Sequence, residues 1–290
     1  MAHTEYLDKV KYSKKLVQKA LAMFKNPVVA CSFGKDSIVV LHMVRQYTKE
    51  IKVLWNNTLV EYPDTYEFAR KIIKDWSLDC IEAKPKLTFW EIVKEHGFPI
   101  YARNSEGDRQ CAARMCCNEL KKKPTVAALR EIECDLYFTG LTRHESRLRE
   151  FSARKYGDFF YSKKWEHWKC HPILNWTTED VWQYIEDHDI PYNSLYDKDE
   201  VKIDGGIRTG CWPCTQAIKY GKLQHLREYY PKLFDLLVVK KKLGEIMLDL
   251  RIENYKNTKS RVGDYMRNTT YKKLGVEKAL DLHPCFFDRL

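Results

Sequence analysis

The segment Ser32–Ser37 places hydroxyl, amine and carboxylate side chains within one short stretch of chain. It follows an apolar run at residues 27–31, so we expect a tight loop between a buried strand and the helix that begins behind it. Backbone N–H groups and the positive end of a helix dipole make such a loop suited to anions, phosphate above all. Gly34 lets the backbone approach phosphate oxygens closely, and Lys35 adds a point charge.

The other residues of this loop add further polar groups. Ser32 and Ser37 supply hydroxyl donors, and Phe33 offers its backbone between Ser32 and the glycine. Asp36 is unusual in an anion site, so it either shapes the loop or coordinates Mg²⁺. A plain strand–turn–helix joint, whose serine and aspartate only cap the helix, is the simpler alternative. The pattern differs from a Walker P-loop, which reads GxxxxGK[ST].

Several of the ten cysteines are clustered, which indicates metal binding or redox chemistry. Cys116 and Cys117 are adjacent, and much later Cys211 and Cys214 form a CxxC pair. Four thiolates suit either a [4Fe–4S] cluster or zinc. Cys111, close to the first pair, is a labile ligand, a sulfur-relay thiol or an inert residue. Four cysteines stand singly and are interpreted as buried packing residues: Cys31, Cys80, Cys134 and Cys170.

The composition is that of a globular protein, with 44% hydrophobic and 13% aromatic residues in a chain of 290. No apolar run approaches the ~20 residues that cross a bilayer. The N-terminus lacks the apolar segment of a secretory signal, so we expect a cytoplasmic enzyme with no membrane partner. The net charge of +10 permits an anionic partner, either a nucleotide or a nucleic acid.

Apolar runs and amphipathic segments alternate along the chain, which predicts an α/β fold with a doubly wound, mostly parallel sheet. After a first helix at residues 5–25, we expect strands at 27–31, 51–55, 78–83 and 135–139, and helices at 64–75, 89–96 and 123–131. Strand signals stop near residue 215, and lysine-rich helices are expected at 219–237 and 238–252. The predicted division is an N-terminal helix (1–26), a nucleotide-binding domain with the cysteines (27–218) and a helical C-terminal segment (219–290).

Doubly wound sheets bind ligands at the carboxyl ends of their strands. Asn57 and Thr58 follow the second expected strand, and Gly140 follows the last. Arg143 and Arg147 come next, and a guanidinium group grips phosphate or sulfate through paired hydrogen bonds. A solvated helix start is the alternative for these arginines. The predicted catalytic residues are Lys35, Asp36 and Arg143.

The loop resembles the SxGxDS fingerprint of PP-loop proteins, and later segments resemble one family of that class, the phosphoadenosine phosphosulfate (PAPS) and adenylyl-sulfate (APS) reductases. The later segments are Gly140–Arg147, His171–Ile185 with Ile190–Asp197, and the cysteine pattern CC…CxxC. The resemblance covers about residues 25–218, and the matching segments follow one another along the chain in the same order as in the family. It implies an adenine nucleotide alpha-hydrolase-like fold, with ATP or an adenylyl sulfate as ligand. It also implies a [4Fe–4S] cluster rather than zinc on Cys116, Cys117, Cys211 and Cys214.

Two features depart from the reductase pattern. Reductases of this family attack their substrate with a cysteine in a Glu-Cys-Gly-Leu/Ile-His segment near the C-terminus, and this chain has none. Cys285 is the candidate for a displaced equivalent or a relay thiol. Reductases of this family usually have no lysine at the position of Lys35, whereas the sequence GKDS is typical of relatives that handle ATP. An added cation suits the triphosphate, where charge develops on departing pyrophosphate.

Two hypotheses follow. In the first, the protein resembles the PAPS-reductase-like ATP pyrophosphatase of bacterial DNA phosphorothioation systems. It would use ATP and Mg²⁺ to adenylylate a target so that sulfur from a cysteine desulfurase replaces oxygen, with nucleic acid as the acceptor. In the second, it is an APS or PAPS reductase that releases sulfite, with a thioredoxin-like donor and Cys285 as nucleophile. A tRNA thiolation enzyme and a non-catalytic nucleotide-binding subunit are further alternatives. Lys35 and the missing reductase segment favour the first.

Overall fold

The computed structural model describes residues 2–99, 102–103, 109–110, 112–163, 165–198, 209–258 and 262–283. The chain forms two compact units. The first comprises Met1–Ile92, Cys116–Tyr196 and Arg208–Cys211, and it contains the main sheet. The second comprises Val93–Met115, Asp197–Ile207 and Trp212–Leu290.

The main sheet has six strands in the order β3-β2-β1-β6-β8-β7. Their bounds are β1 Pro27–Ala30, β2 Lys52–Asn56, β3 Cys80–Ala83, β6 Leu136–Phe138, β7 Phe159–Ser162 and β8 His167–Cys170. All neighbouring pairs are parallel except β7 with β8, which are antiparallel. The predicted mostly parallel α/β sheet is therefore confirmed. The antiparallel β7–β8 pair at one edge was not predicted.

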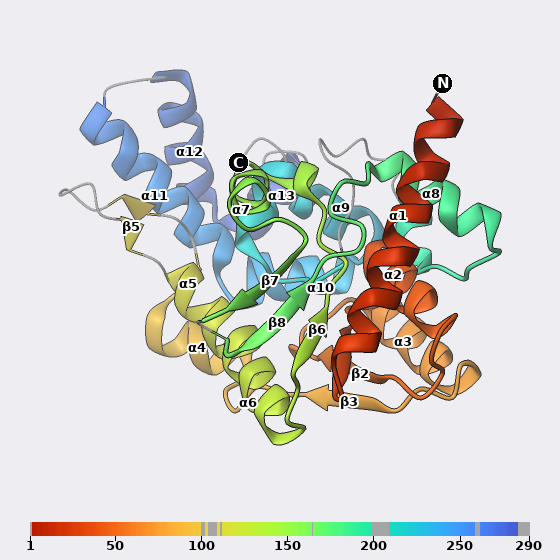
Figure 1. Cartoon of the computed structure of the whole chain (residues 1–290). Helices are drawn as coiled ribbons and strands as arrows, with labels where there is room; N and C mark the ends of the chain where they lie inside the picture. The colour runs from red at the N-terminus through yellow and green to blue at the C-terminus, as the bar shows by residue number, and fades with distance from the viewer. Residues whose placement is uncertain are drawn as a thin grey trace. The chain divides into compact units, whose positions relative to one another are not determined.

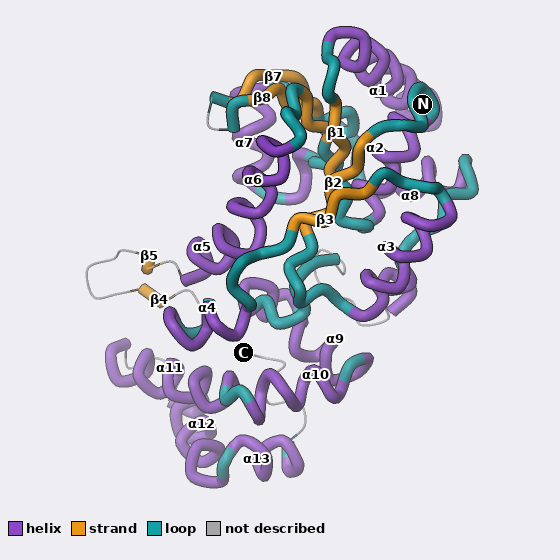
Figure 2. Tube along the Cα trace, turned by 90° about the horizontal axis from the view of Figure 1, so that it is seen from below, coloured by secondary structure: helices purple, strands orange, loops and turns teal. Residues whose placement is uncertain are grey.

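Each face of the sheet carries its own core, because successive side chains of a strand point to opposite faces. Val29 and Cys31 belong to the larger cluster, whereas Val28 belongs to the smaller one and Ala30 packs against it. Four helices supply the larger cluster: α1 Ala2–Met23, α2 Lys35–Arg45, α3 Pro63–Asp75 and α8 Thr178–Asp187. On the other face α6, Lys123–Glu131, packs through Ala128 and Leu129. Figures 1 and 2 show these helices on the two sides of the strands.

α8 begins with a capping box. The Thr177 hydroxyl accepts from the Asp180 N–H at 3.2 Å, and the Asp180 carboxylate accepts from the Thr177 N–H at 2.7 Å. This reciprocal capping box satisfies two orphan donors of the helix. Trp176, fully buried beside it, donates from its indole Nε1 to the hydroxyl of Ser13 in α1 at 3.0 Å, which joins the first helix to this segment.

The second unit is helical over most of its described residues, as expected. Its C-terminal helices are α9 Lys222–Tyr229, α10 Pro231–Asp235, α11 Leu243–Thr258, α12 Val262–Leu274 and α13 Val276–Leu282. A short two-stranded antiparallel ribbon, β4 Ala102–Arg103 with β5 Arg109–Gln110, belongs to the same unit. Within the described segments, no helix combines the length and the apolar character needed to span a membrane.

Candidate functional site

The strand order reverses beside β1, which is flanked by β2 on one side and β6 on the other. A crevice at the carboxyl ends of the strands opens at such a switch point in doubly wound sheets. The loop between β1 and α2 and the loop after β6 both start there. The fold therefore brings together the two segments, Ser32–Ser37 and Gly140–Arg143, that the sequence analysis assigned to the nucleotide.

The loop is organised around the buried hydroxyl of Ser37. This hydroxyl donates to the carbonyl of Gly34 at 2.9 Å and accepts from the backbone N–H of Ser32 at 3.2 Å. The Ser32 hydroxyl lies 3.3 Å from the same oxygen. Ser37 thus closes the loop on itself, which leaves Ser32, the more exposed of the two hydroxyls, to meet a ligand.

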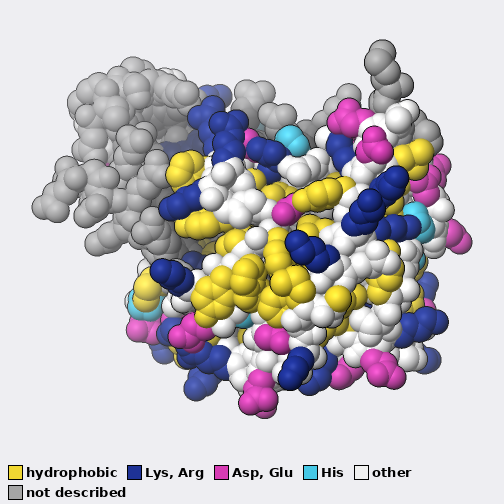
Figure 3. Space-filling model, in the orientation of Figure 1, with side chains coloured by type: hydrophobic (Ala, Val, Ile, Leu, Met, Phe, Trp, Pro, Cys, Tyr) yellow, Lys and Arg dark blue, Asp and Glu magenta, His cyan; other side chains and the backbone are white. Residues whose placement is uncertain are grey.

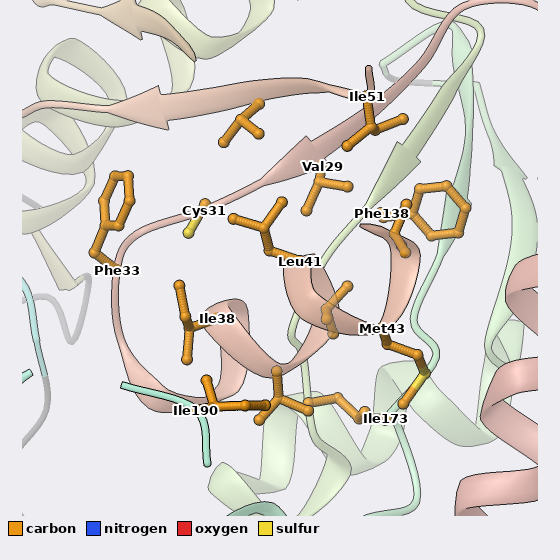
Figure 4. Packing of buried hydrophobic residues seen from close by; sticks show 14 of the residues in the cluster. Val29, Cys31, Phe33, Ile38, Leu41, Met43, Ile51, Phe138, Ile173 and Ile190 are labelled. Carbon is orange, nitrogen blue, oxygen red and sulfur yellow. The ribbon is translucent and has the colours of Figure 1, made fainter. Parts of the chain in front are cut away.

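Phe33 fixes the loop from below. Its backbone is left-handed, with φ of 57°, a conformation that costs a non-glycine residue ~1 kcal/mol or more. Its ring is fully buried and belongs to the larger core cluster (Figure 4). The ring packs edge-on against Trp55 at a centroid distance of 5.3 Å. The side chain predicted at the nucleotide site is therefore an anchor, and only the Phe33 backbone remains to face a phosphate.

Both glycines of the predicted site stand where a side chain would collide. A Cβ on Gly140 would lie 2.6 Å from the backbone carbonyl of Asp36 and 2.8 Å from the N of Ser37. A Cβ on Gly34 would overlap the hydroxyl of Thr209 and come within 3.1 Å of the Tyr196 hydroxyl. Gly140 thus lets the β6 loop approach the start of α2, and Gly34 lets Thr209 and Tyr196 approach the phosphate loop.

Lys35 and Asp36 occupy the first turn of α2. The Lys35 Nζ lies 2.8 Å from the Asp36 Oδ1, and both side chains are mostly buried, with exposed fractions of 15% and 19%. An ammonium and a carboxylate side by side at a helix N-terminus supply one group for phosphate oxygens and one for a divalent cation. The structure therefore places the two predicted catalytic residues as a pair.

Tyr196, which lies in the family-like segment Ile190–Asp197 and was not predicted as a site residue, contacts the loop directly. Its hydroxyl accepts a hydrogen bond from the backbone N–H of Lys35 at 3.1 Å. Burial raises the pKa of Tyr196 to about 12, so the hydroxyl stays protonated near neutrality, although hydrogen bonds with the Lys35 backbone and with Thr209 oppose that rise. The one signal in the sequence was the family-like segment that ends in Asp197; Thr209 carried none.

Asn57 and Thr58 use their side chains within the β2–α3 loop. Asn57 donates to Glu82 at 2.5 Å and accepts from the N–H of Leu59 at 2.9 Å. Thr58 is fully buried and donates to Glu61 at 2.6 Å. Both side chains are buried and already hydrogen-bonded within the protein, so only the backbone of this loop can contact a nucleotide. The side-chain hydrogen bonds fix the conformation of that backbone.

Arg143 is held in a bidentate ion pair. Its Nε and Nη2 donate to Glu150 at 2.7 and 3.0 Å, and its Nη1 donates to Asn175 at 2.9 Å. Hydrogen bonds from Arg143 and then Arg154 lower the pKa of Glu150 to about 2. Glu150 comes from α7, Arg147–Tyr156, and was not predicted as a functional residue.

A hollow of about 980 Å³ opens beside this ion pair. Its charged lining is four lysine and arginine residues against two glutamates: Lys9, Arg143, Arg147 and Arg154 with Glu5 and Glu150. The excess of positive charge suits an anion. Arg143 and Arg147 thus line one hollow, and their binding of phosphate or sulfate stays a prediction.

The predicted metal ligands are distributed over both compact units. Cys116 and Cys117 end α5, Ala112–Cys117, and lead into a π-helix at Asn118–Lys122. Cys211 donates from its Sγ to the Thr58 hydroxyl at 3.4 Å, whereas Cys214 belongs to the second unit. Among the described residues, no group of three or more His, Cys, Asp or Glu side chains is arranged to hold a metal ion.

The end of β2 connects two of these segments. The Asn56 side chain donates to the carbonyl of Lys121, in the π-helix, and to the Thr125 hydroxyl, both at 3.1 Å. Cys211 pairs with Glu61 in an isolated antiparallel bridge. Both segments therefore attach to the carboxyl-end loops of β2. The possible relay thiols Cys111 and Cys285 lie outside the described residues.

The four single cysteines were predicted to be buried packing residues, and the prediction is confirmed for two of them. Cys31 and Cys170 are buried, and Cys80 and Cys134 are half-buried. Burial raises the pKa of Cys31 to about 11 and that of Cys80 and Cys134 to about 12. A thiol with so high a pKa is protonated near neutrality and therefore a poor nucleophile or metal ligand.

Comparison with known proteins gives consistent matches. The sequence pattern of the phosphoadenosine phosphosulfate reductase domain matches residues 26–217. Proteins named adenosine 5'-phosphosulfate reductase from Bacillus cereus and Bacillus mycoides are each 30% identical over 217 residues, which cover 74% of this chain and 84% of the relative. The crystal structure of a PAPS reductase from Candida auris, in a phosphate complex, has a TM-score of 0.53 and 22% identity over 69% of this chain and 88% of its own.

Proposed function

The chain belongs to the phosphoadenosine phosphosulfate reductase domain family, and on that premise we propose that it is an ATP pyrophosphatase that activates an acceptor for sulfur insertion. In this reaction an acceptor oxygen attacks the α-phosphorus of ATP, and pyrophosphate leaves. A sulfur nucleophile then displaces AMP, so that sulfur takes the place of oxygen. A cysteine desulfurase is the expected source of the sulfur, and nucleic acid is the expected acceptor.

The observation that carries this proposal is the pair formed by Lys35 and Asp36 at the N-terminus of α2, 2.8 Å apart. Departing pyrophosphate gains negative charge, and an ammonium fixed beside it stabilises that charge. An adenylyl sulfate has no triphosphate that would use this cation. The lysine therefore favours ATP over a sulfonucleotide.

The residues of the site divide the work as follows. Backbone N–H groups of the loop and the Ser32 hydroxyl bind phosphate oxygens, while Lys35 neutralises the leaving pyrophosphate. Arg143 and Arg147 line the adjacent positive hollow and orient the α-phosphate or the acceptor. Glu150 holds the Arg143 guanidinium in one plane, which limits how it can approach a ligand.

Asp36 is the residue that fits Mg²⁺. Its carboxylate oxygen is a hard ligand, and Mg²⁺ is commonly held by one or two carboxylates together with substrate phosphates. The Lys35 ammonium now bonded to the carboxylate would turn to the phosphates when the metal nucleotide binds. Mg²⁺ supplies charge neutralisation at the phosphates.

Four cysteines, Cys116, Cys117, Cys211 and Cys214, fit an iron–sulfur cluster by the chemistry of their donors. Two of their segments attach to the carboxyl-end loops of β2, on the side of the sheet where the nucleotide would bind. A [4Fe–4S] cluster held there would supply electron or sulfur transfer near the activated acceptor. In this proposal Cys111 is the relay thiol.

APS reduction is the second candidate, favoured by the names of the 30%-identical relatives. It needs a nucleophilic cysteine that attacks the sulfur of the sulfonucleotide and a thiol donor that later releases sulfite. Cys285 is the only candidate nucleophile that the sequence offers near its C-terminal end.

Calorimetric titration of the anaerobically loaded protein with ATP–Mg²⁺, APS and PAPS separates the two functions. The proposal expects preference for ATP, and pyrophosphate release that Lys35→Ala abolishes while Cys285→Ser leaves it intact. A preference for APS or PAPS, with sulfite formation that Cys285→Ser eliminates, would replace it with the reductase.

A further inference from the structure

An alternating row of lysines and aromatic rings lies at the β7 edge of the sheet. Lys155 Nζ stands 5.0 Å above the ring of Tyr156, which stacks on Phe160 with centroids 5.0 Å apart and planes at 23°. Phe160 of β7 is the register partner of Lys169 in β8. The Lys169 Nζ in turn lies 4.2 Å from the ring centroid of Trp165. We call these five residues the edge row.

The row belongs to a part of the surface that other elements leave open. β7 is the last strand of the sheet, and α7, which precedes it, buries only Ala153. Tyr156 is 48% exposed, and two apolar side chains of α7 are more exposed still, Phe151 at 66% and Leu148 at 82%. Figure 3 shows hydrophobic side chains gathered over β7 with lysine and arginine side chains beside them. Exposed apolar groups in such number mark an interaction surface.

The charge of this surface is positive. Lys155, Lys163 and Arg154 are exposed here, and Lys169 is half-buried in the row itself. The nearby carboxylates are already engaged: Asp158 accepts from the Tyr12 hydroxyl, and Glu166 pairs with Arg130. An occupant must therefore bring negative charge, and flat groups that stack on rings.

We propose that the edge row binds single-stranded nucleic acid. Bases would stack on Tyr156 and Trp165, while Lys155 and Lys169 pair with the phosphates between them, since aromatic rings alternating with cations suit a strand whose bases are unstacked. An acidic peptide would satisfy the lysines and leave the rings without flat partners. The role of the bound strand as the sulfur acceptor rests on the proposed function. The binding of the strand itself needs neither ATP nor the cysteines.

The test is fluorescence anisotropy of a labelled twelve-nucleotide thymidine strand, titrated with the full-length protein without ATP at two salt concentrations. Wild-type protein is expected to bind with a salt slope of about −1.4 or steeper, since two phosphate contacts on a single strand each contribute about −0.7. Tyr156→Leu, which keeps an apolar side chain and removes the ring, should weaken binding about tenfold. Lys155→Glu should weaken binding and flatten the slope by about 0.7 or more.

Two exposed residues of another surface serve as matched controls. Tyr47 follows α2 and Lys74 lies on α3, and Tyr47→Leu and Lys74→Glu should bind the strand as the wild type does. Three outcomes would overturn the proposal. The controls could weaken binding as much as the edge-row variants do, or Tyr156→Leu and Lys155→Glu could both bind the strand as tightly as the wild type. The third outcome is that the wild-type protein does not bind the strand at low salt. If Tyr156→Leu does not fold, Lys155→Glu decides, because that side chain is exposed.

The result is separable from the proposed function. ATP binding, measured by calorimetry, should be unchanged in Lys155→Glu, whose position is outside the nucleotide loop. Strand binding without ATP binding would uphold the edge row and reject the pyrophosphatase. ATP binding with no strand binding would reject the edge row and leave the proposed pyrophosphatase standing.

Discussion

The hydroxyl of Tyr196 accepts a hydrogen bond from the backbone N–H of Lys35, at 3.1 Å, across 161 positions of the sequence. This N–H is one of the orphan donors at the start of α2, and such donors are what a phosphate loop offers to its ligand. In the proposed nucleotide complex, a phosphate oxygen would take the place of the tyrosine hydroxyl at this N–H. A nucleotide that uses this N–H must displace the hydroxyl.

The first prediction concerns that displacement. In Tyr196→Phe the Lys35 N–H loses its partner, which should cost ~1 kcal/mol of unfolding free energy. A nucleotide phosphate then satisfies the donor without displacing anything, so affinity for ATP–Mg²⁺ should rise about fivefold. Calorimetry and urea unfolding of the same preparations measure both effects. Weaker binding in Tyr196→Phe would mean instead that the hydroxyl itself contacts the nucleotide.

The second prediction concerns the closeness of two loops. Gly140→Ala places a methyl group 2.6 Å from the backbone carbonyl of Asp36, where neither partner is a flexible side chain. The phosphate loop must therefore shift, and we expect nucleotide affinity to fall more than tenfold, with a loss of ~1–3 kcal/mol in stability. Titration with ATP–Mg²⁺ and thermal unfolding provide the measurements.

A helical glycine of the second unit provides the control for this substitution. Nothing lies within 4 Å of a Cβ on Gly263, so Gly263→Ala should leave nucleotide binding unchanged and should not destabilise the protein. Normal nucleotide affinity in Gly140→Ala would show that the β6 loop and the phosphate loop do not constrain each other.

Prediction from sequence succeeded where physical signals were local. The strands β1, β2 and β6 are short apolar runs buried on both faces, and the structure places them, and the edge strand β3, within one or two residues of the expected bounds. It failed for β7 and β8, since Phe159–Cys170 mixes aromatic rings with lysines and has no clear alternation. β7 has no buried residue, and the two middle residues of β8 are only half-buried, so neither strand shows a continuous apolar run.

Prediction of the candidate site also succeeded for residues that are consecutive in sequence and failed for residues that depend on distant contacts. The Ser32–Ser37 loop was recognisable because its residues are consecutive, and the fold puts Gly140 against it as expected. Tyr196 was missed because its role depends on a contact distant in sequence. Glu150 was missed because a glutamate on a charged helix resembles any solvated residue until Arg143 is seen beside it.

The third prediction follows from buried histidines. Burial lowers the pKa of His171 to about 3 and that of His42 to about 4, whereas an unfolded histidine titrates near 6.5. Below pH 6.5 the unfolded chain takes up protons that the folded one does not. Stability should therefore be complete above that pH and fall on acidification towards pH 4, by up to ~1.4 kcal/mol per pH unit for each histidine.

Urea unfolding at a series of pH values measures this slope, and His171→Asn tests its source. The His171 ring nitrogen Nδ1 lies 2.7 Å from the Thr139 hydroxyl, a contact that an amide can partly replace. In this variant, the change of unfolding free energy per pH unit should be smaller by the contribution of one histidine, whatever the stability of the variant at neutral pH. An unchanged slope would assign the acid sensitivity to other groups.

The fourth prediction concerns the four cysteines proposed as cluster ligands. Protein purified without oxygen should be brown, and Cys116→Ser and Cys214→Ser should each lose that colour and its bound iron, because a [4Fe–4S] cluster needs all four thiolates. Cys134→Ser is the matched control: this half-buried thiol has its pKa raised to about 12 and donates to the carbonyl of Leu136 at 3.2 Å. It should keep full colour.

Elemental analysis of the same preparations separates the outcomes. Colourless wild-type protein with about one zinc per chain would assign the same cysteines to a structural zinc site. Full colour and iron in Cys214→Ser would show that the CxxC pair does not supply the ligands. Loss of iron in Cys116→Ser and Cys214→Ser but not in Cys134→Ser would support both cysteines as ligands.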